Sequence, residues 1–308
     1  MEELKILNTN GVSVIITTVN RPNELKKAIK SCLQQNYSDM EIIVVVDGGN
    51  PEILEILSHY PNIKSISNVP NVGGASSRNI GIQNATKYWV ALLDDDDEWL
   101  DDKLNIQIKE LEEYEEKEVV SFTSLFTYVK NSDHKYILPR EEYKLGENIG
   151  DYLFKLKNGR WNGWIQTSTL MAPKHVFLKY PFDPTLPKHQ DWDWIMRIYQ
   201  KSIPVVHIKQ PLTIYHKISS TSVAQNPNWK FSYNWINKYK NIISDTSYSD
   251  FLISVVRNGV SKDSNLTIKE RIMEIKKFGK YIPYRNRLKI GYYRFLLQYI
   301  YNFYKKRK

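Results

Sequence analysis

The sequence predicts an α/β protein, with a mostly parallel central sheet flanked by helices and a helical C-terminal extension. Over the first 130 residues, short runs rich in β-branched residues alternate with stretches of helical periodicity. Several of these runs end in acidic, polar or glycine residues, and open α/β sheets bind ligands beyond the carboxyl ends of their strands. After about residue 225 the patterns are helical.

Each predicted element follows from a local pattern. The run VSVIITTV at 12–19 is a buried strand, and Arg21-Pro22 opens a helix. The apolar residues of that helix recur at helical spacing: Leu25, Ala28, Ile29, Cys32 and Leu33. Strands are also expected at 42–47, 63–68, 88–93, 203–208 and 212–217, and helices from Pro51, through Asn84 and over 191–200.

Composition restricts the class of protein. Hydrophobic residues make up 42% and charged residues 25% of the 308, as in ordinary globular proteins. The single cysteine, Cys32, excludes an internal disulfide, favours a reducing compartment and is expected in the core. The polar start and the lack of an apolar run of membrane-spanning length lead us to expect a cytoplasmic protein.

Four consecutive aspartates, Asp94 to Asp97, follow the fourth predicted strand directly. Crowded carboxylates repel one another unless a positive charge lies among them. One interpretation is an acidic helix N-terminus, with a helix beginning at Glu98-Trp99. The other is a site for Mg²⁺ or Mn²⁺, which take oxygen ligands and often complete their shell with phosphate oxygens.

Six motifs in a fixed order make the chain similar to family 2 glycosyltransferases, which have the GT-A fold and invert the sugar's anomeric centre. They span about residues 11–225 and read SVIITTVNRP, VVVDGGN, NVGGASSRNIGI, LLDDDDEWLDDKL, KHQDWDWIMR, and YH followed by SSTS. The fourth contains the family's D-x-D metal motif. The resemblance implies a Rossmann-like nucleotide-binding domain over residues 1–225, with a nucleotide-binding half at 1–130 and an acceptor-binding half at 131–225. Residues 226–308 are the helical extension.

The resemblance also assigns residues to the nucleotide sugar donor. It implies that Asp47 accepts the uracil N3 proton. The other residues implied in nucleotide binding are Thr17, Val19, Arg21, Asn71, Gly74, Arg78, Asn79, Asp94 and Asp95. Alternation along the strand predicts that Asp95 points the other way and is the most replaceable of the four aspartates. Two departures from the family pattern, Thr17 and Val46, lie in this pocket and weaken the inference of uridine.

The metal and the chemistry have their own candidates. The resemblance implies that Asp96 and Asp94 bind Mn²⁺ or Mg²⁺, with His216 near the metal or the diphosphate, and that Asp191 is the general base. Without the resemblance, Asp191 is better explained as a helix N-cap, and His216 as a structural histidine. Gln190 replaces the family's Glu, so the pKa of Asp191 should be raised less than beside a second carboxylate.

Acceptor binding is the least specific part of the pattern. The candidates are Trp164, His189, Gln190, Trp192 and Asp193, and core packing is the alternative for the tryptophans.

The tail at 281–308 contains eight Lys or Arg and no acidic residue, and so contributes most of the net charge of +9. It also contains seven tyrosines and the run FLLQYIYNF. Such a segment suits peripheral contact with an anionic membrane, on the inner face of the cytoplasmic membrane, and a packed terminal helix is the alternative. No motif suggests a nucleic-acid partner.

The resemblance thus implies a metal-dependent transferase that moves a sugar from UDP to a hydroxyl of a glycan or polymer, on a lipid-linked acceptor if the tail docks on a membrane. By analogy with the family, such a reaction would serve surface polysaccharide biosynthesis. A nucleotidyltransferase that makes the sugar nucleotide is an alternative, but it predicts a Gly-rich loop where this chain has VNRPN. A binding module that has lost catalysis is the third interpretation.

Overall fold

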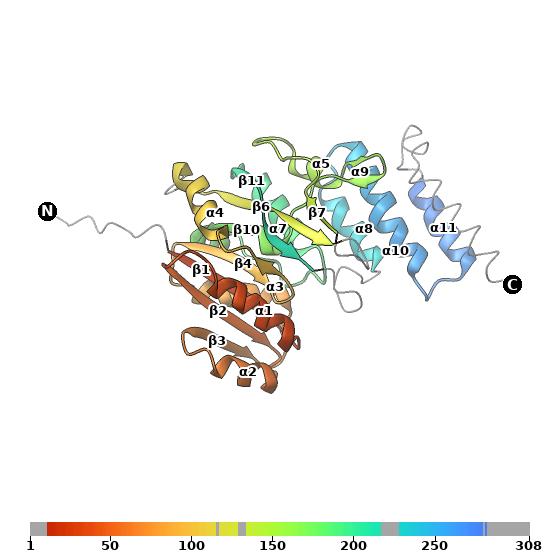
Figure 1. Cartoon of the computed structure of the whole chain (residues 1–308). Coiled ribbons are helices and arrows are strands. Elements are labelled where there is room, and N and C mark those ends of the chain that lie inside the picture. The colour runs from red at the N-terminus through yellow and green to blue at the C-terminus, as the bar shows by residue number, and fades with distance from the viewer. Residues whose placement is uncertain (1–10, 115–116, 129–133, 217–227, 280, 282–308) are drawn as a thin grey trace. The chain divides into compact units, whose positions relative to one another are not determined.

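The computed structural model describes residues 11–114, 117–128, 134–216, 228–279 and 281 (Figure 1). The chain divides into two compact units. One comprises residues 1–147 and 165–221, and the other comprises residues 148–164 and 222–308. The predicted division at residue 225 stays a prediction.

The first unit is built on a mixed sheet in the strand order β3-β2-β1-β4-β10-β6-β11-β5, with β7 beside β6. The strands are β1 (Val12–Thr18), β2 (Met40–Asp47), β3 (Ile63–Asn68), β4 (Trp89–Asp94), β5 (Glu98–Trp99), β6 (Val120–Tyr128), β7 (Lys135–Leu138), β10 (Leu170–Pro173) and β11 (Val205–Tyr215). Strands β1 to β4 pair in parallel, as predicted, and β6 pairs in parallel with β11. The predicted α/β class is confirmed.

Helices lie on both faces of the parallel strands. They are α1 (Pro22–Leu33), α2 (Pro51–Ser58), α3 (Gly74–Asn84), α4 (Lys103–Leu111), α6 (Lys174–Lys179) and α7 (Gln190–Gln200), with short 3-10 turns η1 (Glu112–Tyr114) and η2 (Thr167–Thr169). Proline begins α1 and α2, because its fixed backbone suits the first turn, and the Asn50 side chain caps α2. On one face, Gly81 of α3 packs against Ile15, where a β-carbon would clash.

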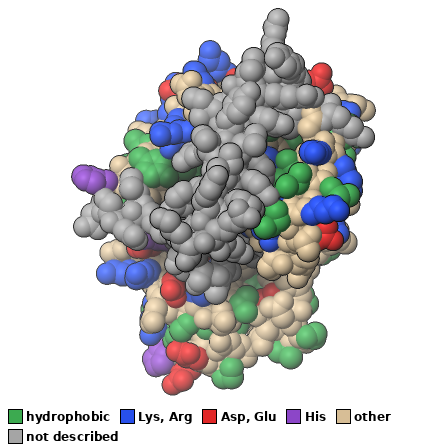
Figure 2. Space-filling model, turned by 90° about the vertical axis from the view of Figure 1, so that its right-hand side faces the viewer, with side chains coloured by type: hydrophobic (Ala, Val, Ile, Leu, Met, Phe, Trp, Pro, Cys, Tyr) green, Lys and Arg blue, Asp and Glu red, His purple; other side chains and the backbone are tan. Residues whose placement is uncertain are grey.

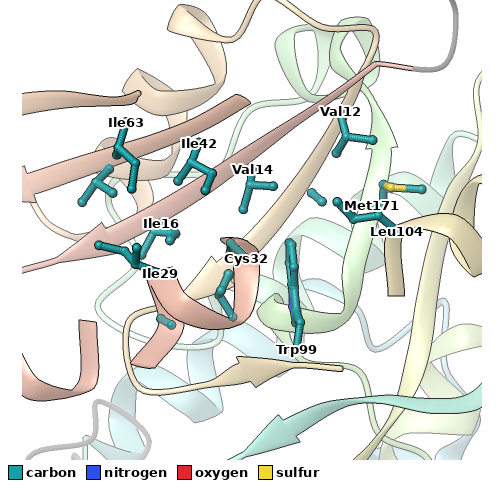
Figure 3. Packing of buried hydrophobic residues seen from close by; sticks show 14 of the residues in the cluster. Val12, Val14, Ile16, Ile29, Cys32, Ile42, Ile63, Trp99, Leu104 and Met171 are labelled. Atoms are coloured by element: carbon teal, nitrogen blue, oxygen red, sulfur yellow. The ribbon is translucent and has the colours of Figure 1, made fainter. Parts of the chain in front are cut away.

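Alternate residues of β1 meet α1 in the main core (Figure 3). Val14 and Ile16 lie on the face of β1 that packs against Ile29 and Cys32 of α1. Trp99 belongs to the same cluster. Cys32 is fully buried, as predicted, and burial raises the pKa of its thiol to about 12. The inclusion of Leu33 in the apolar face is wrong, because this residue ends the helix and is 54% exposed.

Two local predictions are also wrong. Glu98 and Trp99 form the short strand β5, which pairs with β11, and the helix begins only at Lys103. The acidic residues 94–97 are therefore not the N-terminus of a helix that starts at Glu98. The two strands expected at 203–208 and 212–217 form one strand, β11, whose pairing with β6 is irregular around Pro211.

The second unit is mostly helical. It contains α5 (Ile149–Phe154), the small hairpin β8 (Leu156–Lys157) and β9 (Arg160–Trp161), α8 (Trp229–Lys238), α9 (Asp245–Phe251), the π-helical turn η4 (Leu252–Val256), α10 (Arg257–Lys262) and α11 (Ile268–Gly279). Phe154 packs edge-on against Trp235 and Phe251, and the buried Asp250 carboxylate accepts the Leu156 N–H. These contacts tie residues 148–164 to the C-terminal helices.

The described surface in Figure 2 mixes basic, acidic and hydrophobic side chains, without one block of basic charge on that face. Of the basic tail at 281–308, only Tyr281 is among the described residues. In the described part of the chain, no helix has the length and apolar character to cross a membrane.

Candidate active site

The carboxyl ends of β1, β2 and β4 meet at one edge of the sheet, as predicted. Thr17 is paired with Asp94 on β4, and Asp47 ends β2. The loop that begins at Asn71 contacts Asp47, so it reaches the same edge.

The four aspartates form a turn after β4, which we call the acidic turn (residues 94–97). The Asp97 N–H closes it by donating to the Asp94 carbonyl at 3.1 Å. The prediction that Asp95 points away is wrong, because the strand ends at Asp94 and alternation stops there. The buried Asp95 carboxylate instead accepts the Thr18 hydroxyl at 2.7 Å and Arg21 Nη1 at 3.0 Å. Asp95 is thus firmly held, and nothing in these contacts makes it replaceable.

Two arginines neutralise this turn. Arg21 Nη1 donates to Asp96 Oδ2 at 2.7 Å as well as to Asp95. Arg78 Nη2 donates to Asp94 Oδ1, and Arg78 Nη1 donates to Gln190 Oε1 at 2.9 Å. Arg78 therefore links the end of β4 to the start of α7.

Gln166 and Ser168 hold the turn from the other side, and the sequence did not indicate either residue. Gln166 Nε2 donates to Asp94 Oδ2 at 3.1 Å and to Asp97 Oδ2 at 2.8 Å. The Ser168 hydroxyl donates to Asp97 at 2.6 Å, and the same oxygen accepts the Asp94 N–H. A Gln-x-Ser sequence before a short strand is not distinctive, so only the folded contacts reveal this role.

Burial and mutual repulsion govern the charges of the acidic turn. Desolvation, and then the neighbouring Asp94, raise the pKa of Asp96 to about 6. Desolvation also raises the pKa of Asp95, against the opposing effects of Thr18 and Arg21. The pKa of fully buried Asp97 is raised well above its ordinary value, mainly by desolvation. Arg21 and Arg78 supply positive charge that offsets part of this repulsion.

Asp47 shapes the loop that precedes α3. Its two carboxylate oxygens accept the Val72 and Gly73 N–H groups at 2.7 and 2.8 Å. Gly73 has a φ of +86°, which glycine adopts without strain. The expected contact of Asp47 with uracil stays a prediction, as does the place of Asn71 in the pocket.

Asn79 and Gly74 have evident structural roles. The Asn79 amide exchanges two hydrogen bonds with the Phe182 backbone, at 2.8 and 3.0 Å. A β-carbon at Gly74 would lie 3.3 Å from Arg78 Nη1, so glycine leaves room for that guanidinium. Val19, which follows β1, is 46% exposed.

Asp191 lies in the first turn of α7, where its Oδ1 accepts the Trp192 N–H at 2.9 Å. Desolvation raises the pKa of Asp191 to about 6, with a smaller increase from Asp94 and an opposing effect of Arg78. Arg78, which pairs with Asp94, also donates to Gln190, the residue that precedes Asp191. A carboxylate with a pKa near neutrality suits a general base.

The residues around Asp191 are fixed by their own contacts. Gln190 Nε2 donates to the Leu186 carbonyl, and the buried Asp193 accepts Arg197 Nε at 2.8 Å. The His189 ring stacks on Trp192 at 4.9 Å between centroids, and His189 has a left-handed backbone with a φ of 64°. Burial and then Lys188 lower the pKa of His189 to about 3, so its ring is neutral.

His216 contacts the acidic turn through its backbone, because its N–H donates to Asp97 Oδ1 at 3.1 Å. Its Nε2 lies 2.8 Å from Glu98 Oε1 and donates to it, since a carboxylate accepts. Trp164 belongs to the second unit, so its expected role in the acceptor site stays a prediction. Among the described residues, no group of three or more His, Cys, Asp or Glu is arranged to hold a metal ion.

The sheet order, with the acidic turn at its edge, is that of the GT-A fold. Among solved structures, residues 1–349 of S. aureus TarS have the same fold, with a TM-score of 0.63, 17% identity and coverage of 90% of this chain and 82% of that one. The same protein in complex with UDP-GlcNAc aligns with a TM-score of 0.61 and 16% identity.

The family model for glycosyl transferase family 2 matches residues 13–172, and the chain belongs to this family. It is therefore a transferase. The amylovoran biosynthesis glycosyltransferase AmsB of Erwinia amylovora is 27% identical over 238 residues, which are 74% of this chain and 77% of AmsB. An uncharacterized glycosyltransferase of Rickettsia conorii is 28% identical over 274 residues, and the match spans 42% of that relative's length.

Proposed function

We propose that the chain transfers a sugar from UDP, with inversion, to a hydroxyl of a glycan or other polymer, using a divalent cation at the donor diphosphate. Residues 1–130 would bind the nucleotide, residues 131–225 the acceptor, and residues 226–308 would form the helical extension. The proposal rests on family membership and on the chemistry of the described side chains.

One observation carries the proposal most directly. Hydrogen bonds run from Asp94 through Arg78 to Gln190, which is the neighbour of Asp191. The candidate base and the candidate donor site are thus joined by one guanidinium. A transferase needs this proximity, since the attacking hydroxyl must reach the sugar while the diphosphate leaves.

The acidic turn suits Mg²⁺ or Mn²⁺, because Asp94 and Asp96 offer oxygen atoms, the ligands that hard ions prefer. The described residues lack a group of three acidic, His or Cys ligands, so the fit is to an ion that takes one or two carboxylates and completes its shell with phosphate oxygens and water. When bound, the ion would supply positive charge to the departing diphosphate. His216 could join it through Nδ1 while its Nε2 donates to Glu98.

Asp191 would take the proton from the acceptor hydroxyl. Its pKa of about 6 leaves it ionised at pH 7 yet basic enough to accept a proton in the transition state. Arg78 would hold Asp94 in place at the donor. Attack from the face opposite the diphosphate inverts the anomeric centre in one step, and this mechanism needs no covalent nucleophile.

The choice of UDP and of a polysaccharide acceptor draws on the relatives. TarS forms a complex with UDP-GlcNAc, and AmsB is named for amylovoran biosynthesis. We extend these descriptions to a role of this chain in surface polysaccharide biosynthesis. The acceptor would contact His189, Gln190, Trp192 and Asp193 of the first unit. Docking of the tail on an anionic membrane, which would suit a lipid-linked acceptor, stays a prediction.

Binding and turnover test the proposal separately. UDP with Mn²⁺ should raise the melting temperature, because a ligand of the native state stabilises it. If no nucleoside diphosphate shifts the melting temperature, with or without the metal, the proposal is refuted. Asp191→Asn should abolish sugar transfer and donor hydrolysis but keep the shift with UDP. The exposed Asp101→Asn is the matched control. Unchanged turnover in Asp191→Asn would show that Asp191 is not the base.

A further inference from the structure

Arg21 pairs with two carboxylates of the acidic turn. A single nitrogen, Nη1, lies 3.0 Å from Asp95 Oδ1 and 2.7 Å from Asp96 Oδ2. The residue sits between the end of β1 and the first turn of α1, so its backbone is anchored on both sides. Its side chain is 25% exposed and that of Asp96 is 17% exposed, so water only partly screens this pair.

A cation bound to Asp96 would compete with this guanidinium. Two positive groups within a few ångströms repel each other strongly where water is scarce. The Asp96 oxygen that accepts Arg21 would need to exchange that bond for a bond to the ion. An ion alone therefore gains little from Asp96, because the carboxylate is already neutralised.

The other side chains that could be metal ligands also indicate that an ion alone would bind weakly. The described residues hold no group of three acidic, His or Cys side chains suited to a metal ion. An ion at Asp96 would depend on further oxygens, and the diphosphate of the donor is the group that supplies them in the proposed reaction. The arrangement thus favours an ion that enters together with the diphosphate.

We propose that Arg21 is the resident counter-ion of the acidic turn, and that a divalent cation replaces it at Asp96 only when a nucleoside diphosphate binds. This inference rests on the proposed function, since it assumes a nucleotide and a cation at this site. Thr18 keeps Asp95 in place after the exchange, because its hydroxyl donates to the other Asp95 oxygen at 2.7 Å. Asp95 thus keeps a hydrogen-bond donor when Arg21 moves away.

The test measures Mn²⁺ binding by the paramagnetic signal of the free ion, with and without UDP. In the wild type, Mn²⁺ alone should bind weakly, and saturating UDP should strengthen its binding. Arg21→Gln should bind Mn²⁺ alone about tenfold more tightly than the wild type, within the usual range of site coupling. Saturating UDP should then strengthen Mn²⁺ binding less in Arg21→Gln than in the wild type.

Two further variants make the result specific to the position of the charge. Lys27→Gln removes a positive charge from an exposed residue of α1, the helix that Arg21 precedes. The Mn²⁺ affinity of this variant should match the wild type. Arg21→Lys keeps a cation near Asp96 and should bind Mn²⁺ alone as weakly as the wild type. Circular dichroism confirms folding before each titration.

The outcomes separate the two proposals. If UDP causes no thermal shift and no change in Mn²⁺ binding in the wild type, the proposed function fails. If UDP binds but Arg21→Gln has the wild-type affinity for Mn²⁺ alone, or if Arg21→Lys binds Mn²⁺ alone as tightly as Arg21→Gln, the counter-ion role of Arg21 is refuted while the proposed function stands. Equal tightening in Lys27→Gln would also refute it, because the effect would then reflect net charge.

Discussion

Arg78 donates a hydrogen bond of 2.9 Å to Gln190, a residue that lies 112 positions further along the chain. The same guanidinium pairs with Asp94 in the acidic turn. The neutral amide thus occupies the position next to Asp191 where the family pattern has a glutamate. The effect of this amide on catalysis can be measured by replacing Gln190 with glutamate.

Gln190→Glu should move the acidic limb of the pH profile of kcat/KM upward. In the wild type, kcat/KM should fall as the pH drops below about 6, because the base Asp191 becomes protonated. A second carboxylate beside Asp191 raises its pKa, and pairing with Arg78 limits the shift to about half a unit to one unit. Gln200→Glu, at the exposed end of the same helix, is the control. An unmoved limb in Gln190→Glu would contradict the assignment of Asp191.

Asp191→Asn should stabilise the protein at pH 8 while it abolishes transfer. Since desolvation raises the pKa of Asp191 to about 6, the folded state binds this proton more tightly than the unfolded chain does. The stability that this group contributes is present below the unfolded pKa and is lost as the pH rises through about 6. Urea unfolding should show Asp191→Asn more stable by about 1–2 kcal/mol at pH 8 and equal to wild type near about pH 4. Lower stability than wild type at pH 8 would be inconsistent with a desolvated carboxylate.

Gln166→Glu should disturb the acidic turn strongly at pH 8. The substitution removes the amide donor to Asp94 and Asp97 and places a third carboxylate beside them. We expect a loss of about 2–3 kcal/mol in the free energy of unfolding and weaker UDP binding. At pH 5 the protein should regain part of the lost stability, because the introduced carboxyl group can donate a hydrogen bond once it is protonated. If stability and UDP affinity match those of the Gln200→Glu control, Gln166 does not hold the turn.

The left-handed backbone of His189 should make a glycine variant more stable than an alanine variant, the reverse of the usual order in folded proteins. His189 precedes α7 with a φ of 64°, where a β-carbon is unfavourable and glycine is not. His189→Gly and His189→Ala both remove the ring stacked on Trp192, so they differ only in the backbone. His189→Gly should therefore be more stable than His189→Ala by about 1 kcal/mol in urea unfolding. The opposite order would mean that the turn relaxes and does not fix the start of α7.

Much of the site could be predicted because its parts follow local patterns. The strand runs that end at Asp47 and Asp94 are buried in β2 and β4, and parallel strands bring such ends to one edge. The helix with Asp191 in its first turn also begins where predicted, within one residue. Buried apolar runs and helical spacing are properties of neighbouring residues, so the chain reveals them before it folds.

Long-range pairing explains what the patterns missed. Glu98 and Trp99 form a strand only because β11 lies beside them, and Gln166 and Ser168 reach the acidic turn because β10 pairs antiparallel with β4. The side-chain direction of Asp95 was predicted wrongly because β4 ends at Asp94, and strand alternation no longer applies beyond that residue. No local propensity contains such information, since each contact joins residues about 70 to 115 positions apart.

By itself, the sequence determined the α/β class, the family, the edge of the sheet that carries the acidic residues and the types of side chain available there. The tertiary structure alone decided how these charges are paired: Arg21 with Asp95 and Asp96, Arg78 with Asp94, and Gln166 with Asp94 and Asp97. The physical reason is that buried carboxylates take whichever donors the packed sheet brings within reach, and folding sets that distance.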